Sequence, residues 1–135
     1  MENIYINSLM KLEGDKKEFK YRGFRCLIKR HKRLGHLCGY IELPKHHNLY
    51  GRDYGEIEET YDYELPAHGG LTFSGKLIDE DGYLIGFDCA HAGDYIPLDP
   101  LSSQLNLGET YRTMRYVEDI LKEMVDFITE YEGGD

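Results

Sequence analysis

The sequence predicts an α+β fold in which an antiparallel β-sheet is packed by one long C-terminal helix. Apolar residues alternate with polar ones over residues 20–43, and further runs of strand length separated by turns follow up to residue 94, which is typical of a sheet. Over residues 110–131 they instead recur every three or four positions, which is typical of a helix. We therefore expect a single domain over residues 1–135, with an N-terminal segment at 1–19, the sheet and its site loops at 20–94, and the helix at 110–131.

Turn-forming residues divide the sheet region into strands. Residues 20–43 should form a hairpin around a basic turn at 30–35, and Pro44 should end its second strand because proline cannot donate to a ladder. Residues 45–55 read as a loop. Further strands are expected at 57–65, 70–77 and 83–89, the last two joined by a turn at 79–82. Residues 95–108 are expected to be irregular.

The C-terminal helix carries an apolar stripe that should close one face of the sheet. Its members are Tyr111, Met114, Val117, Leu121, Met124, Ile128 and Tyr131. An alternative is that part of this stripe forms the seam of a homodimer. A homodimer is the assembly we expect.

Composition limits the classes of partner. The chain has 135 residues, 41% of them hydrophobic and 30% charged, which suits one core and a solvated surface. A formal net charge of -9 argues against duplex nucleic acid or an anionic membrane as the main partner. No stretch approaches the roughly 18 to 20 apolar residues that span a bilayer, so a cytoplasmic location is expected. Three cysteines without a C-x-x-C pair indicate reduced, mostly buried thiols.

The first of two motif segments is Pro66-Ala67-His68-Gly69-Gly70-Leu71-Thr72-Phe73-Ser74-Gly75. Glycines after His68 would let the backbone approach a ligand and offer amide donors to an anion or a carbonyl group. Thr72 and Ser74 would share a face of a strand. The plainer interpretation is a tight turn that His68 caps.

The second motif segment is Gly86-Phe87-Asp88-Cys89-Ala90-His91-Ala92-Gly93-Asp94. Asp88, His91 and Asp94 are three residues apart, so a turn after the strand would bring two carboxylates and an imidazole together. Such a group can bind a divalent metal, act as a general acid and base, or hydrogen-bond a polar ligand. The spacing matches no standard zinc signature, and a mere turn remains an alternative.

A third polar stretch follows Pro44. Lys45 and Tyr50 in this loop are candidates to hold a phosphate and to stack on a ring, and an exposed loop is the alternative. The chain has none of the P-loop, dinucleotide, metalloprotease or G-x-S-x-G patterns, so we expect no familiar catalytic machine, no catalytic residues and no cofactor beyond a divalent metal. Twelve tyrosines and no tryptophan suit stacking on a base or sugar, although packing on a small sheet explains tyrosines equally well.

These motifs, with Tyr21-Arg22-Gly23-Phe24-Arg25-Cys26, Gly35-His36-Leu37-Cys38-Gly39-Tyr40 and Leu43-Pro44-Lys45-His46-His47-Asn48-Leu49-Tyr50-Gly51, resemble a family of small uncharacterised proteins of tailed bacteriophages and prophages. The resemblance covers residues 21–94. In that family an aromatic residue, often tryptophan, tends to precede the second motif segment, where this chain has Tyr83-Leu84-Ile85. The resemblance implies a phage setting in a host cell, and no particular activity.

The leading hypothesis is a phage-type protein that binds a small polar, nucleotide-derived ligand and sequesters it as a counter-defence factor. Its ligand-binding residues would be His68, Gly69, Gly70, Thr72, Asp88, His91, Asp94, Lys45 and Tyr50. One alternative is a metal-assisted or acid/base hydrolase of such a ligand, with Asp88, His91, Asp94 and His68 as ligands or proton carriers. Another is a protein-binding inhibitor of a host factor.

Overall fold

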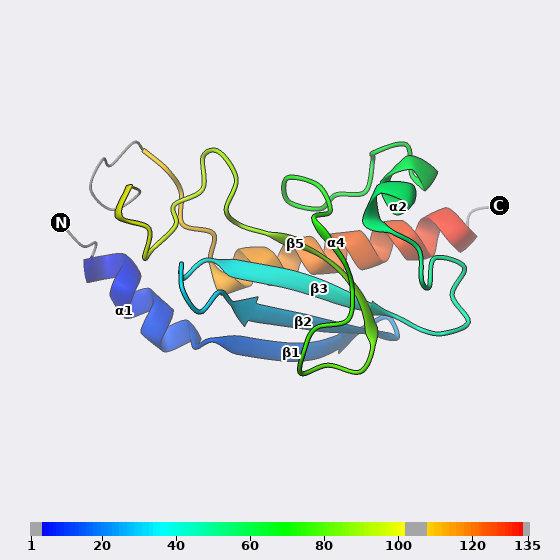
Figure 1. The fold of residues 1–135 in the computed structure, drawn as a ribbon, viewed down its shortest axis with the longest axis horizontal. Helices are drawn as coiled ribbons and strands as arrows, with labels where there is room; N and C mark the ends of the chain where they lie inside the picture. Colours follow the sequence, from blue (N-terminus) through cyan, green and yellow to red (C-terminus); the bar gives the residue numbers. More distant parts are fainter. Residues whose placement is uncertain (1–3, 102–107, 134–135) are drawn as a thin grey trace.

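A computed structural model describes residues 4–101 and 108–133 and shows an α+β fold (Figure 1). Five strands form an antiparallel sheet in the order β1-β2-β3-β5-β4. In chain order the elements are α1 (Ile4–Glu13), β1 (Lys16–Tyr21), β2 (Phe24–Arg30), β3 (Leu37–Leu43), α2 (Tyr54–Thr60), β4 (Phe73–Gly75), β5 (Tyr83–Asp88) and α4 (Met114–Gly133).

The hairpin predicted at residues 20–43 is formed by β2 and β3. Its ladder runs from Cys26 opposite Ile41 to Arg30 opposite Leu37, and β3 ends immediately before Pro44. A second, tighter turn precedes this hairpin and joins β1 to β2. Its two residues, Arg22 and Gly23, have φ of 50° and 88°, as the commonest two-residue hairpin turns require.

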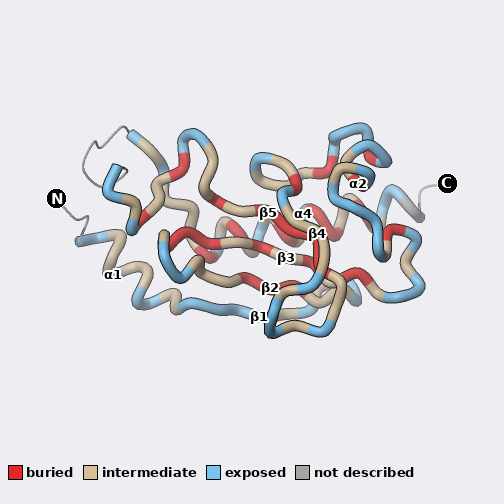
Figure 2. Tube along the Cα trace, in the orientation of Figure 1, coloured by how far each residue is buried: buried red, intermediate tan, exposed pale blue. Residues whose placement is uncertain are grey.

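Helix α4 covers one face of the sheet and forms the main core with it. In Figure 2 the buried positions gather along β2, β3 and β5. Gly39 of β3 makes this packing close, because a Cβ there would lie 2.9 Å from both Phe87 and Val117. Most residues of the predicted stripe are buried within the chain itself, namely Met114, Val117, Leu121, Met124 and Ile128. A homodimer would therefore need another surface, and it stays a prediction.

The other face of the sheet is partly covered by the connection between β4 and β5, residues 76–82, which folds back over β2 (Figure 1). Arg25 of β2 binds Glu80 of this connection at 2.6 Å and also contacts Glu18 and Glu42 at 2.9 Å each. Lys29 binds Asp79 at 2.8 Å. Single exposed ion pairs contribute little, but this network holds the connection in one position.

Four expectations about the elements were wrong or incomplete. The strand expected at 57–65 is instead helix α2, capped by Asp53, which accepts a hydrogen bond from the Gly55 backbone. The strand expected at 70–77 is reduced to the three residues of β4. The N-terminal segment holds α1 and β1, and the last helix begins at Met114, four residues later than expected.

Part of the region expected to be irregular, residues 102–107, lies outside the described residues. Within the described ranges, none of the helices has the length and apolar character needed to cross a membrane.

Candidate functional site

Asp94 is the centre of a buried polar network that joins the two motif segments. Its side chain is 0% exposed and accepts hydrogen bonds from His68 Nε2 at 2.8 and 3.0 Å and from Arg112 Nε at 2.7 Å. The backbone N–H of His91 donates to Asp94 Oδ2 at 3.0 Å. A carboxylate away from water is stable only when its oxygens are satisfied in this way.

A short contact between distant stretches of chain builds this network. Asp94 and Thr110 form a parallel bridge, in which Tyr95 N–H donates to the Thr110 carbonyl at 2.7 Å and Thr110 N–H donates to the Gly93 carbonyl at 2.9 Å. The bridge places the segment leading into α4 beside Asp94. Arg112 therefore reaches the carboxylate, and its guanidinium lies 5.2 Å from the ring centre of Tyr116.

Both ring nitrogens of His68 are engaged within the protein. Nε2 faces the carboxylate of Asp94, and Nδ1 lies 2.7 Å from the hydroxyl of Tyr116. Because an ionised carboxylate can only accept, a neutral His68 carries its proton on Nε2 and accepts from Tyr116 through Nδ1. In this arrangement His68 positions its neighbours, and neither nitrogen is presented to a ligand.

The charges in the network support one another. Burial by itself would raise the pKa of Asp94, but hydrogen bonds from Arg112 and His68 outweigh burial and lower it below its ordinary value. The hydrogen bond to Asp94 raises the pKa of Arg112. Burial raises the pKa of Tyr116, which keeps its hydroxyl protonated at neutral pH. Asp94 is thus an anion paired with a fixed cation.

Asp88 extends the network toward solvent. It ends β5, accepts a hydrogen bond from the Thr72 hydroxyl at 3.0 Å and another from Ala90 N–H at 3.0 Å, and lies 3.4 Å from His91 Nε2. Its side chain is 31% exposed. The rings of His68 and His91 are 5.8 Å apart. We call the set of His68, Thr72, Asp88, His91 and Asp94 the His–Asp cluster; its role in binding stays a prediction.

The glycine pair has a structural reason to be there. Gly69 has φ of 70°, and a Cβ on it would lie 2.6 Å from the His91 ring. Gly70 has φ of 89°, and its N–H donates to the Ala67 carbonyl at 3.1 Å, so this amide closes the turn. The pair lets the first motif segment pass directly against the second.

A hollow of about 440 Å³ opens beside Asp88. We call it the Asp88 hollow; its lining includes Thr72, Tyr40, Phe73 and His36. His36 is 5% exposed, and its Nδ1 has no hydrogen-bond partner among the described residues. Burial lowers the pKa of His36, so the ring is neutral at pH 7. The lining thus combines an accessible carboxylate with the rings of Tyr40, Phe73 and Phe87, and it includes a histidine whose Nδ1 has no partner among the described residues.

Lys45 and Tyr50 do not join the His–Asp cluster. Tyr50 packs against Tyr83 with ring centres 5.3 Å apart, and Tyr83 begins the strand that Asp88 ends. Five strand steps separate Tyr83 from Asp88, about 17 Å. Lys45 is exposed and follows the end of β3 that pairs with Tyr83. A binding role for either residue stays a prediction, but at a separate place.

Sequence reasoning missed Arg112, Tyr116 and His36. Arg112 and Tyr116 depend on the bridge at Thr110, which no local pattern announces. His36 directly precedes Leu37 and Gly39, which begin an alternating, strand-like stretch. That alternation could have placed His36 just before the start of a strand.

Within residues 4–101 and 108–133, no three His, Cys, Asp or Glu side chains are grouped so that they could hold a metal ion. Comparison of the chain with protein-family models, with curated proteins and with solved structures gave no match.

Proposed function

We propose that this protein binds a small polar, nucleotide-derived ligand in the Asp88 hollow, without transforming it. The observation that carries the proposal is that one hollow is lined both by a partly exposed carboxylate, Asp88, and by His36, whose buried Nδ1 has no hydrogen-bond partner among the described residues. A buried polar atom without a partner costs free energy, and a bound ligand would recover it.

The lining favours the nucleoside part of such a ligand. The volume of the Asp88 hollow falls within the range of small-molecule sites. Tyr40 and Phe73 offer ring faces or edges, and Asp88 can accept from ribose hydroxyls or from a base amine. The residues that line the hollow, all within the described chain, include neither lysine nor arginine, so phosphates would extend outside it.

The phage resemblance supports sequestration as the purpose of binding. A protein that withdraws a nucleotide signal needs affinity and no attacking group. The two ring nitrogens of His68 are both occupied, which is consistent with a supporting network.

Calorimetric titration of the purified protein with nucleosides, cyclic nucleotides and ADP-ribose-type nucleotides tests the proposal. We expect at least one to bind and to be recovered intact after heat release. Asp88→Asn should weaken binding by about tenfold or more, because it removes a charged acceptor. Asp119→Asn, at an exposed position of α4, is the matched control and should leave affinity unchanged. If none of these compounds binds, the proposal is contradicted and a protein partner is favoured.

A second candidate is a hydrolase that uses acid/base chemistry. It is favoured by one observation: two imidazole–carboxylate pairs, His68 with Asp94 and His91 with Asp88, have rings 5.8 Å apart. In that case chromatography would detect products, and His91→Gln would abolish turnover while binding persisted. A metal-assisted form would also require added divalent ion.

A further inference from the structure

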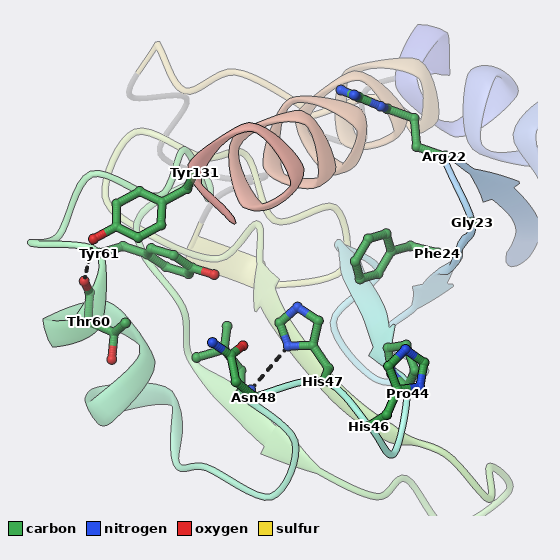
Figure 3. A pocket seen from close by; sticks show the side chains of 11 residues that line it. Arg22, Gly23, Phe24, Pro44, His46, His47, Asn48, Thr60, Tyr61 and Tyr131 are labelled. Atoms are coloured by element: carbon green, nitrogen blue, oxygen red, sulfur yellow. Dashed lines mark hydrogen bonds between the residues drawn. The ribbon is translucent and has the colours of Figure 1, made fainter. Parts of the chain in front are cut away.

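The loop that follows β3 lines a hollow of its own, at the other end of the sheet from Asp88. This hollow has a volume of about 680 Å³ (Figure 3). We call it the aromatic hollow, because Phe24 stands on one side of it and Tyr61 and Tyr131 stand on the other. His47 and Asn48 lie between the two sides, and buried Leu49 also contributes to the lining.

Both sides of the aromatic hollow contact α4. Tyr61 meets Tyr131 edge to face, with ring centres 4.9 Å apart. On the opposite side, Arg22 in the turn before Phe24 binds Asp126 of α4 at 2.8 Å. Asp126 and Tyr131 belong to the same helix, so both sides of the hollow contact α4. A ring that is already held by its neighbours loses little entropy when a ligand stacks on it.

Two polar side chains at the aromatic hollow are available for recognition. Neither the Asn48 amide nor the His46 ring makes a hydrogen bond to any part of the chain that the structure describes, and both residues are exposed. An asparagine amide offers one donor and one acceptor side by side, the pair that reads the N6 and N7 edge of an adenine. The hollow therefore provides rings for stacking and an amide for the edge of a base.

Charge disfavours a phosphate here. Arg22 is the one Lys or Arg among the lining residues, and it is already paired with Asp126 at 2.8 Å and Glu130 at 3.4 Å. Recognition would thus rest on the faces and edge of a neutral ring.

We infer that the aromatic hollow is a second binding site, which takes a planar heteroaromatic ring of the purine-nucleoside type. The ring stacks on Tyr131, which is 54% exposed at the rim of the hollow, and Asn48 hydrogen-bonds its edge. This site is separate from the Asp88 hollow and stands even if the Asp88 hollow binds nothing.

The test is an NMR titration of protein labelled on its aromatic rings, with adenosine, AMP and ribose 5-phosphate as probes. We expect adenosine and AMP to shift the ring signals of Phe24 and Tyr131 with similar dissociation constants, and ribose 5-phosphate to leave them unchanged. Tyr131→Ala should weaken adenosine binding by about fivefold or more, the range expected for one stacked base. Asn48→Ala should weaken it by about two- to tenfold, the range expected for one hydrogen bond.

Two control variants separate this site from other effects. Tyr5→Ala removes a tyrosine that is 79% exposed on α1 and should not alter the titration. Asp88→Asn should leave the Phe24 and Tyr131 shifts intact, whatever it does to binding at the Asp88 hollow. The inference is overturned if adenosine shifts neither ring, if Tyr131→Ala binds as the unmodified protein does, or if Asp88→Asn abolishes the shifts.

Discussion

Replacing Asp94 with alanine should be one of the most destabilising substitutions in the His–Asp cluster. Its fully buried carboxylate accepts from His68, from Arg112 and from the His91 backbone, at 2.7–3.0 Å. Alanine leaves those donors without their acceptor and leaves a guanidinium without its counter-charge. Breaking a buried ion pair in this way costs about 3–5 kcal/mol. That is a large fraction of the roughly 5–15 kcal/mol by which a domain is stable.

Asp88→Ala provides the internal comparison. Asp88 also accepts two hydrogen bonds, from Thr72 and from Ala90 N–H, but its side chain is 31% exposed and water can replace them. We expect a loss of about 1 kcal/mol, as for ordinary hydrogen bonds. Urea denaturation at pH 7, followed by circular dichroism with the slope checked for each variant, measures both losses.

The pH dependence of the free energy of unfolding tests the role of Asp94 in a second way. The lowered pKa of Asp94 means that its contribution is present above its unfolded pKa and is lost as pH falls through the folded pKa. Asp94→Asn should therefore lose stability at pH 7 and show a weaker dependence on acid than the unmodified protein. If Asp94→Ala cost less than about 1 kcal/mol, or no more than Asp88→Ala, the central role assigned to Asp94 would be refuted.

Three further predictions concern the core and the buried titratable groups. Gly39→Ala should destabilise the protein by about 1–3 kcal/mol in the same urea assay, because its Cβ would press on Phe87 at 2.9 Å; an unchanged midpoint would show that α4 can move away. Burial lowers the pKa of His36. The contribution of this neutral ring to the free energy of unfolding is therefore complete above about pH 6.5 and is lost as pH falls below that value. Denaturation at pH 7.5 and 5.5 should show that His36→Gln flattens this dependence, and an equal slope in both proteins would contradict it. Burial raises the pKa of Cys26 to about 12 and of Cys38 to about 11, so iodoacetamide at pH 8 should alkylate the native protein about a hundredfold more slowly than the unfolded chain; comparable rates would contradict burial.

The elements that sequence predicted well are those whose pattern and packing agree. In β3, alternate residues from Leu37 to Leu43 are buried, which is the period-two signal of a strand with one covered face. The apolar stripe of α4 is buried at a helical spacing in the same way. Both patterns arise because each element presents one side to the same core.

Helices α2 and α1 were not predicted from the sequence. Ile57, Tyr61 and Leu65 are all buried and are spaced by four, which is a helical period, and Asp53 is a suitable N-cap before them. These signals were present, but the segment was interpreted as a strand because its length is typical of one. Helix α1 has no fully buried residue, and its apolar residues Ile4, Tyr5 and Leu12 are exposed, so hydrophobicity marks its inner face only weakly.

The site was predictable in its motif residues and not in its partners. The spacing of Asp88, His91 and Asp94 indicated a shared turn, and the structure does place these residues together. Arg112 and Tyr116 join them from the start of α4 through a single bridge at Thr110. A contact between segments so far apart in the chain leaves no periodic trace in either one.

The order of the strands has a consequence for association between molecules. The outermost strands, β1 and β4, expose the unpaired backbone groups at the two margins of the sheet, where strands of another chain can add. One margin carries Lys16, Lys17 and Lys20, and the other is only three residues long. Charged side chains on the first edge and the shortness of the second are both features that disfavour the addition of a strand from another molecule.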